Sequence, residues 1–367
     1  MNNTNNSTGI MKVVCAILFL FFTFFYLYLY QADVLAMAQH VLSGGRTTYN
    51  ALVGAVLLTF LLYLLQIFVA AIVQLNGRAH ALTYFPSLLL LTVLTDISPS
   101  IDEGFHFGWW WLALPLLIAA YVAVVWFCRQ VQPFEQYSGK MSVFFSPLMA
   151  VNVGTLSVFF LLAATLCDNS DVFHYRMKME GLMAKQKYAE ALEVGRNSLA
   201  TDSSLTCLRV ICLEKTHQLG GHLFTYPLVG GSKSMIPNGT SVKVMMWKDP
   251  KVRIFLRKGQ RIFPQTLEHR LTAYLLDKDI DGFAACLKRS GKRDYSQLPV
   301  HIREALTLYT HKRGNALVVY HNDVMDSDFA DFLALQKKYP DPVSRRSAVR
   351  DAYKNTYWYY FEYASQN

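Results

Sequence analysis

Five long apolar runs occupy the first 167 residues and predict a bundle of membrane-spanning helices. They lie near residues 13–32, 51–75, 79–95, 107–128 and 146–167. About 20 apolar residues at about 1.5 Å per residue cross the ~30 Å hydrocarbon layer of a bilayer. The third run is the shortest and contains Pro86, so it either spans or turns back as a re-entrant segment. We predict that it spans, which gives five helices after a polar tail at residues 1–12.

The pattern changes after Cys167. From residue 168 to residue 367, apolar positions recur at helical spacing among many charges, which predicts a water-soluble domain built from helix pairs. An irregular insert rich in Gly, Pro and Lys interrupts this pattern at residues 221–263. Alternating apolar positions in residues 242–256 leave a β-hairpin open there, and a distorted helix pair fits as well. The predicted fold class is otherwise all-α: a polytopic membrane bundle followed by a soluble helical domain.

One helix pair resembles a tetratricopeptide (TPR) repeat. Tyr188 is followed three residues later by the small Ala191, which lets two helices approach closely, and Tyr175 and Leu182 also fit the repeat. The usual Gly, large apolar residue and Pro of the repeat are replaced here by Met179, Gly195 and Ser203. The resemblance implies that the soluble domain is a TPR-like α-solenoid.

The whole layout is similar to a family of uncharacterised bacterial membrane proteins that have several N-terminal spans and a TPR-like C-terminal region. The resemblance is best at residues 267–287, at residues 298–309 and at residues 357–360. It implies this architecture and a bacterial membrane. It implies no activity, because none is established for the family.

Charge separates the two halves and predicts their orientation. The first 167 residues contain five of the 35 Lys and Arg residues and five of the 26 Asp and Glu residues, so the net charge of +9 lies in the C-terminal part. With Met1 in the cytoplasm, the cytoplasmic segments hold four basic residues against Arg46 alone on the other side. Those four are Lys12, Arg78, Arg129 and Lys140. Five spans then place the C-terminal domain outside the cytoplasm, in the periplasm if this is the inner membrane. Nucleic acid is therefore not an expected partner, in spite of the positive charge.

The loop before the fourth span carries the candidates for catalysis. Its ionisable residues are Asp96, Asp102, Glu103 and His106. Carboxylates in such a loop can hold a metal ion or act as general bases in a membrane enzyme of envelope glycan or lipid chemistry. The alternative is a solvated loop on the acidic side of the membrane.

The soluble domain carries two candidate binding surfaces. Tyr357, Trp358 and Tyr360 belong to an aromatic run that either stacks on sugars or lipid, or packs as a terminal helix on the preceding one. The second surface is a basic run that either contacts anionic lipid or is a solvated face. It consists of Arg289, Lys292 and Arg293.

Two other motifs lack a required residue. Asp277 begins a D-x-D-x-D-G sequence, but the bidentate Glu at the twelfth position of a calcium loop is replaced by Lys288. The sequence from Gly230 to Ser234 lacks the Gly that precedes the Lys of a phosphate loop. No metal or cofactor is therefore predicted. Because no CxxC pair occurs, the six cysteines are predicted to be free thiols.

These observations favour one function and leave an alternative. The leading hypothesis is a membrane-anchored scaffold, whose helical domain binds a protein or peptide while the bundle contacts the lipid bilayer. The alternative is an enzyme that uses the loop at residues 96–106.

Overall fold

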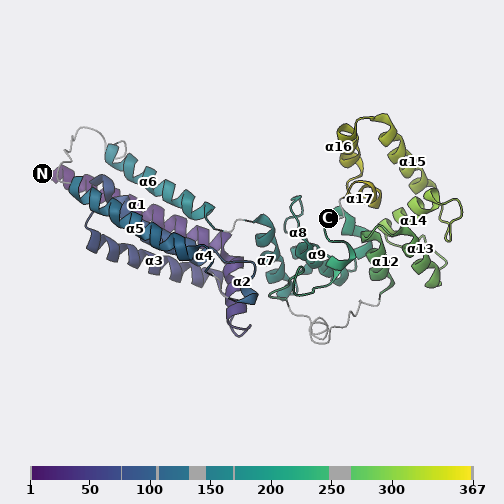
Figure 1. The fold of residues 1–367 in the computed structure, drawn as a ribbon, viewed down its shortest axis with the longest axis horizontal. Helices are drawn as coiled ribbons and strands as arrows, with labels where there is room; N and C mark the ends of the chain where they lie inside the picture. The colour runs from purple at the N-terminus through teal and green to yellow at the C-terminus, as the bar shows by residue number, and fades with distance from the viewer. Residues whose placement is uncertain are drawn as a thin grey trace. The chain divides into compact units, whose positions relative to one another are not determined.

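The computed structural model describes residues 2–75, 77–104, 107–131, 146–167, 170–247 and 266–364. Its regular elements are all helical within these ranges, which confirms the predicted fold class (Figure 1). The chain divides into two compact units, Met1–His174 and Tyr175–Asn367. The division falls close to the change of sequence pattern after Cys167.

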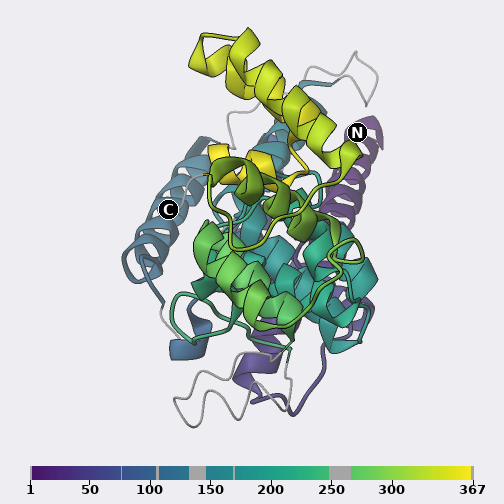
Figure 2. The ribbon, with the colours of Figure 1, turned by 90° about the vertical axis from the view of Figure 1, so that its right-hand side faces the viewer.

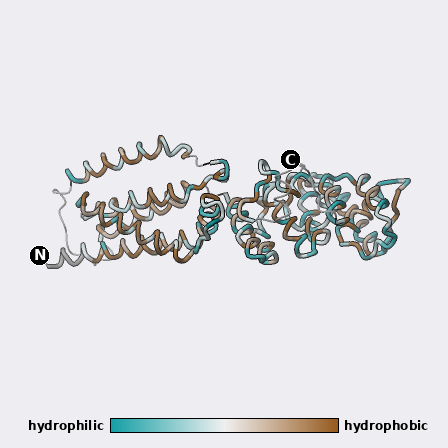
Figure 3. Tube along the Cα trace, turned by 90° about the horizontal axis from the view of Figure 1, so that it is seen from below, coloured by the Kyte–Doolittle hydropathy of each residue, from teal (hydrophilic) through white to brown (hydrophobic). Residues whose placement is uncertain are grey.

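Four helices of the N-terminal unit are long and apolar enough to cross a membrane. α1 (Asn2–Phe25) continues into the π-helical turn η1 (Tyr26–Tyr30), and the other three are α3 (Ala51–Val73), α5 (Trp110–Val131) and α6 (Pro147–Thr165). Much of their apolar surface is open: Leu112 on α5, for example, is 80% exposed. Exposed apolar area on this scale is unfavourable in water and favourable in lipid. Figure 3 shows the apolar colour along these helices.

The third apolar run forms a mixed helix. It begins as the 3₁₀ helix η2 (Gly77–Tyr84) and continues as α4 (Phe85–Thr95), with Pro86 in the first turn of α4. At that position the missing proline N–H leaves no helical hydrogen bond unmade. Eight residues at about 2.0 Å and eleven at about 1.5 Å give a length of roughly 32 Å.

Hydrogen bonds place this mixed helix along α6. The Ala81 N–H donates to Asn152 Oδ1 near the start of α6 at 2.7 Å, and the hydroxyl of Thr95 lies 3.1 Å from Cys167 Sγ just after its end. Asn152 also donates to the Gly77 carbonyl at 2.9 Å. The segment at residues 77–95 therefore runs beside α6 from Asn152 to the end of the helix.

The core of the bundle lies between α1, α3, α4 and α6. Phe19 of α1 packs against Tyr84 with a ring-centroid distance of 5.1 Å, and Phe22 stacks on Phe160 of α6 at 4.1 Å. Ser87 donates to the Leu62 carbonyl at 2.9 Å, which adds a polar link between α4 and α3. Such interhelical hydrogen bonds hold helices together in lipid, where apolar contact alone gives no preference over the solvent.

The C-terminal unit is a set of short helices. In chain order they are α7 (Asp171–Ala184), α8 (Tyr188–Glu193), α9 (Ser203–Lys215), α10 (Leu219–His222), α12 (Leu267–Leu276), α13 (Ile280–Arg289), α14 (Val300–Lys312), α15 (Asp323–Lys338), α16 (Pro342–Tyr353) and α17 (Tyr357–Tyr363). Several begin at a side-chain cap, such as Asp202 for α9 and Asn322 for α15. These caps satisfy N–H groups that the helix itself leaves unpaired.

The TPR-like solenoid is not confirmed. α8 has only six residues, and α17 turns back to pack on α14 instead of extending the stack of α15 and α16 (Figure 2). In a solenoid each repeat contacts only its neighbours. The described part of the insert has two short 3₁₀ helices, η6 (Leu223–Thr225) and η7 (Gly231–Met235), and no strand up to Trp247. The second half of the suggested hairpin lies outside the described residues.

Candidate functional site

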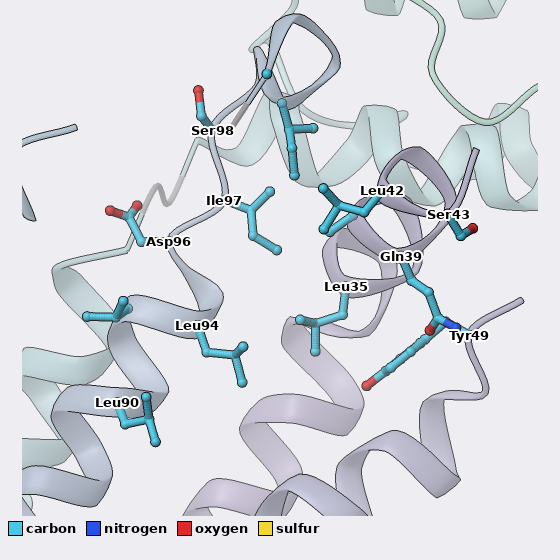
Figure 4. Close-up of a pocket in the computed structure, with 14 residues that line it drawn as sticks. Leu35, Gln39, Leu42, Ser43, Tyr49, Leu90, Leu94, Asp96, Ile97 and Ser98 are labelled. Atoms are coloured by element: carbon cyan, nitrogen blue, oxygen red, sulfur yellow. The ribbon is translucent and has the colours of Figure 1, made fainter. Parts of the chain in front are cut away.

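A pocket of about 670 Å³ lies at one end of the bundle, between α2 (Ala32–Leu42) and α4. Leu35 and Ala38 line it from α2, and Leu90, Val93 and Leu94 line it from α4. Figure 4 shows Leu35 and Leu94 pointing toward the space between the two helices. Its volume is in the range of small-molecule sites, which is about 300–1,000 Å³.

Apart from the buried hydroxyl of Tyr49, the polar groups of the pocket lie at its edge. Gln39 and Ser43 contribute from α2 and the residue after it, and Asp96 and Ser98 contribute from the chain after α4. The amide of Gln39 donates to the Thr47 hydroxyl at 3.0 Å, and the hydroxyls of Ser98 and Ser100 lie 2.8 Å apart. The pocket therefore has apolar walls and a polar rim on one side.

The predicted catalytic carboxylates do not converge. Asp96 accepts a hydrogen bond from Trp110 Nε1 at 2.6 Å, and Figure 4 shows its carboxylate turned away from the apolar walls. Asp102 and Glu103 are exposed on the 3₁₀ turn η3 (Ile101–Glu103). His106 lies outside the described residues. Asp96 is thus hydrogen-bonded to Trp110 at the start of α5. The carboxylates of Asp102 and Glu103 lie at the surface on η3.

The predicted aromatic surface is largely inside the C-terminal unit. Tyr357, Trp358 and Tyr360 are all buried. Trp358 Nε1 donates to the Glu304 carbonyl at 2.8 Å, and the hydroxyl of Tyr360 donates to the Leu276 carbonyl at 2.8 Å. These rings have little surface left on which a sugar could stack. A terminal helix that packs inside the unit explains Tyr357, Trp358 and Tyr360 better than a surface for binding sugars does.

The predicted basic surface is solvent-exposed. Arg289 lies at the end of α13, where its Nε donates to the Ala285 carbonyl at 3.2 Å. Lys292 and Arg293 follow in the exposed segment after that helix. A cation at a helix C-terminus stabilises the helix, so Arg289 has a structural role whatever it binds.

The acidic motifs are engaged within the unit. Asp277 accepts from the backbone N–H and the hydroxyl of Ser232 at 2.8 Å and 2.6 Å, and Asp281 pairs with Arg313 at 2.6 Å. Asp326 accepts from His311 and His321 at 3.1 Å and 3.4 Å. Among the residues that the structure describes, no group of three or more His, Cys, Asp or Glu side chains could hold a metal ion. None of the six cysteines, all of which the structure describes, is in a disulfide.

A buried carboxylate that the sequence does not reveal lies on α7. Glu180 is fully buried, and its Oε2 accepts the backbone N–H groups of Met245 and Met246, both at 2.6 Å. Burial raises the pKa of Glu180, while those hydrogen bonds and the charge of Arg176 offset part of the increase. Arg176 itself pairs with Asp202 at 3.2 Å. In a sequence, a charged residue on a helix usually indicates a solvated face. The burial of Glu180 could not be predicted, because the N–H groups that it accepts lie about 65 residues away in the chain.

Comparison with known families gives one match. Residues 264–364 match a family of unknown function, DUF6057. This range holds the three segments in which the sequence resemblance is best, and it spans α12 to α17. Comparisons with curated proteins and with solved structures give no match. The C-terminal helices α12 to α17 are therefore similar to those of a family whose activity is not known.

Proposed function

We propose that this is a membrane-anchored interaction protein, whose C-terminal unit binds an extended apolar segment of a partner protein. One observation carries the proposal. In the irregular segment between α14 and α15, which bends at Leu317 and Val318, Leu317 and Val319 are 53% and 57% exposed, whereas Val318 and Tyr320 are buried. Two apolar side chains close together in the chain are therefore left at the surface of the unit.

Hydrogen bonds to two side chains of α14 hold this segment in place. The Leu317 N–H donates to the hydroxyl of Tyr309 at 3.1 Å, and the Tyr320 N–H donates to the hydroxyl of Thr310 at 3.2 Å. Val324, in the first turn of α15, is a third exposed apolar side chain nearby in the sequence, at 69%. Because these hydrogen bonds already order the segment, an apolar partner segment that binds here loses less conformational entropy than it would on a mobile loop.

The anchoring half of the proposal rests on the four long apolar helices. With the segment at residues 77–95 as a fifth crossing, the bundle is a multi-pass anchor in a bacterial inner membrane, and the C-terminal unit lies in the periplasm. The length of that segment and its course along α6 support the fifth crossing.

The alternative function, an enzyme that uses the 96–106 loop, is favoured less by this geometry. Asp96 is oriented by Trp110, and Asp102 and Glu103 sit on a surface turn. Replacing Asp102 and Glu103 by Ala separates the hypotheses, because it abolishes an enzyme and leaves the interaction intact.

The proposal is tested by photocrosslinking in the native membrane. A benzophenone amino acid at Val319 of the full-length protein is expected to give one discrete protein adduct. Leu317→Asp should reduce that adduct about tenfold or more, because burying one Leu side chain contributes about 1.5–3 kcal/mol.

The matched control places the same photoreactive residue at Leu199, which is 78% exposed elsewhere on the unit. Equal adducts at both positions, or an adduct at Val319 that survives Leu317→Asp, would contradict the proposal.

A further inference from the structure

We propose that a second pocket of the bundle binds one anionic phospholipid of the phosphatidylglycerol type, with the lipid phosphate at Arg78 and a fatty-acid ester group at Thr155. This pocket has a volume of about 240 Å³ and is lined by residues of η2, α5 and α6. Lipid binding here does not depend on the partner binding proposed for the C-terminal unit.

Arg78 gives the pocket its charge. Its exposed side chain lines the pocket, and none of the described lining residues is acidic. Within the described part of the chain, no hydrogen bond or ion pair engages its guanidinium. Arg129 is different, because its guanidinium already donates to the carbonyls of Ile72 and Val73 at 2.6 Å and 2.9 Å. Arg78 is therefore the available cation of this pocket, and a guanidinium can bind a phosphate through two parallel N–H···O bonds.

The hydroxyl of Thr155, on α6, is a second polar group of the pocket. The hydroxyls of Thr92, Thr95 and Thr165 each donate to the carbonyl four residues earlier at 2.9 Å, which satisfies a helical hydroxyl in lipid. Across the described ranges, the Thr155 hydroxyl makes no hydrogen bond. An unpaired donor is costly away from water, so a ligand with an acceptor at this depth is favoured.

The two groups lie at different depths, as the phosphate and the esters of a phospholipid do. Asn152 bonds to the Gly77 carbonyl and the Ala81 N–H at 2.9 Å and 2.7 Å, so it is level with the start of η2. Thr155 is three residues further along α6, which is roughly 4.5 Å at about 1.5 Å per residue. A phosphate at Arg78 therefore places the ester carbonyls of the same lipid, one glycerol unit below it, toward the Thr155 hydroxyl.

The remaining walls of the pocket are apolar. Phe127 and Val131 of α5 line it and are 61% and 44% exposed. Phe85 closes the gap between α5 and α6 further along the bundle, because its ring centroid lies 5.1 Å from that of Tyr121 and 5.3 Å from that of Phe159. The pocket thus holds the phosphate and ester region of a lipid, while an acyl chain leaves it along the apolar outer side of α5.

The charge and the source of the phosphate follow from the same residues. A zwitterionic lipid brings an ammonium group close to the Arg78 guanidinium, and no carboxylate among the described lining residues offsets that repulsion. Free phosphate would use Arg78 and leave the Thr155 hydroxyl and the apolar walls without a partner. A lipid whose only charge is its phosphate matches all three features of the pocket.

The test uses the full-length protein in nanodiscs of phosphatidylcholine. Traces of phosphatidylglycerol or phosphatidylcholine with the same photoreactive acyl chain are added in parallel, and labelled peptides are mapped by mass spectrometry. We expect the phosphatidylglycerol probe to label residues 78–82 and 127–131 about tenfold more than the phosphatidylcholine probe does. An excess of inorganic phosphate should leave this labelling unchanged.

Three substitutions separate the parts of the site. Arg78→Gln should reduce the preference for phosphatidylglycerol to about twofold or less, whereas Arg46→Gln, at an exposed arginine outside the pocket, should not. Thr155→Val should lower labelling by both probes about fivefold, because both lipids have esters. Val131→Trp fills the pocket and should remove most labelling. Its matched control is Val122→Trp, because Val122 is 59% exposed on α5 and does not line the pocket.

Each contrary result overturns part or all of the inference. Labelling spread evenly over the lipid-facing helices means boundary lipid only, and equal labelling by the two probes rejects selection by charge. Loss of labelling in inorganic phosphate means that the site binds the free ion. If Arg78→Gln and Arg46→Gln act alike, general surface charge attracts the lipid. If Val131→Trp and Val122→Trp label alike while both keep the thermal midpoint of the unmodified protein, the pocket is not the binding site.

Discussion

Two buried carboxylates show how single residues join distant parts of the C-terminal unit. Glu180 ties α7 to the backbone at Met245 and Met246. Glu304 accepts the N–H of Tyr357 at 2.7 Å and lies 3.0 Å from His301 Nδ1. Neither role could be predicted from the sequence, because each carboxylate is surrounded by ordinary helix formers and its partner lies more than 50 residues away. A buried acceptor that satisfies two N–H groups is costly to lose.

Glu180→Ala is expected to destabilise the protein by about 3 kcal/mol, because two loop N–H groups lose their acceptor inside the unit. For a unit of this size that corresponds to roughly 6–12 °C in the thermal midpoint. Glu180→Gln keeps one oxygen acceptor and should cost less than half as much. Scanning calorimetry of the detergent-solubilised protein measures both, and equal midpoints for the two variants would show that the hydrogen bonds contribute little.

Asp326 gives a pH-dependent prediction. Burial raises its pKa, but hydrogen bonds from His311, the Asn322 N–H and His321 outweigh burial and leave the pKa below its ordinary value. A lowered pKa in the folded state contributes stability above the unfolded pKa, near 3.8, that is lost as pH falls through the folded value. Asp326→Asn should therefore lower the thermal midpoint at pH 7, and the difference between the two proteins should shrink as the pH falls below 3.8 toward the folded-state pKa. A constant difference across this range would contradict the assignment.

Individual elements were predictable where one pattern dominates, and less so where several compete. The runs that became α1, α3, α5 and α6 are uninterrupted and apolar, so their length alone identifies them. Pro86 left it open whether the third run spans the membrane. The sequence could not show that a 3₁₀ helix ends at Tyr84, so that Pro86 lies in the first turn of α4, where proline is tolerated. The aromatic run of α17 was equally ambiguous, because stacking platforms and buried helix faces use the same residues. The pocket was missed, since α2 and α4 are far apart in sequence and neither has a motif.

Trp358→Ala should release α17 from α14, at a cost of about 3–5 kcal/mol, because a fully buried ring is removed. Trp358→Phe keeps most of the buried area and loses the hydrogen bond to Glu304, which contributes about 1 kcal/mol. Hydrogen exchange of the amides in residues 357–363 reports the release. Similar protection in Trp358→Ala and in the unmodified protein would mean that α17 is held by other contacts.

At the scale of the whole molecule, sequence and structure agree on a chain of two chemically different parts. The N-terminal unit exposes apolar helices that suit lipid, and the C-terminal unit buries its apolar residues among charged helices. Hydrophobic pattern and charge were sufficient for this division, because both are properties of long stretches. The sidedness of the C-terminal unit depends on an odd or even number of crossings, and hence on one short segment.

We expect Asn367 to face away from the cytoplasm, as five crossings and the distribution of Lys and Arg imply. Alkaline phosphatase fused after Asn367 should be active, and green fluorescent protein fused there should be dark. A second fusion after Ser98 tests the segment at residues 77–95 directly, since it should also give active phosphatase. The reverse pattern at both sites would mean that this segment turns back and that only four helices cross.

The return of α17 to α14 has a consequence for the order of synthesis. Tyr357 and Tyr360 bind partners 53 and 84 residues earlier in the chain, so the core of the C-terminal unit cannot close while α17 is still inside the ribosome. The helices from α7 to α16 leave the ribosome with this part of their core uncovered. If the unit is exported, it crosses the membrane before it is complete. The surfaces around Phe224 and Leu276 therefore stay uncovered until α17 arrives.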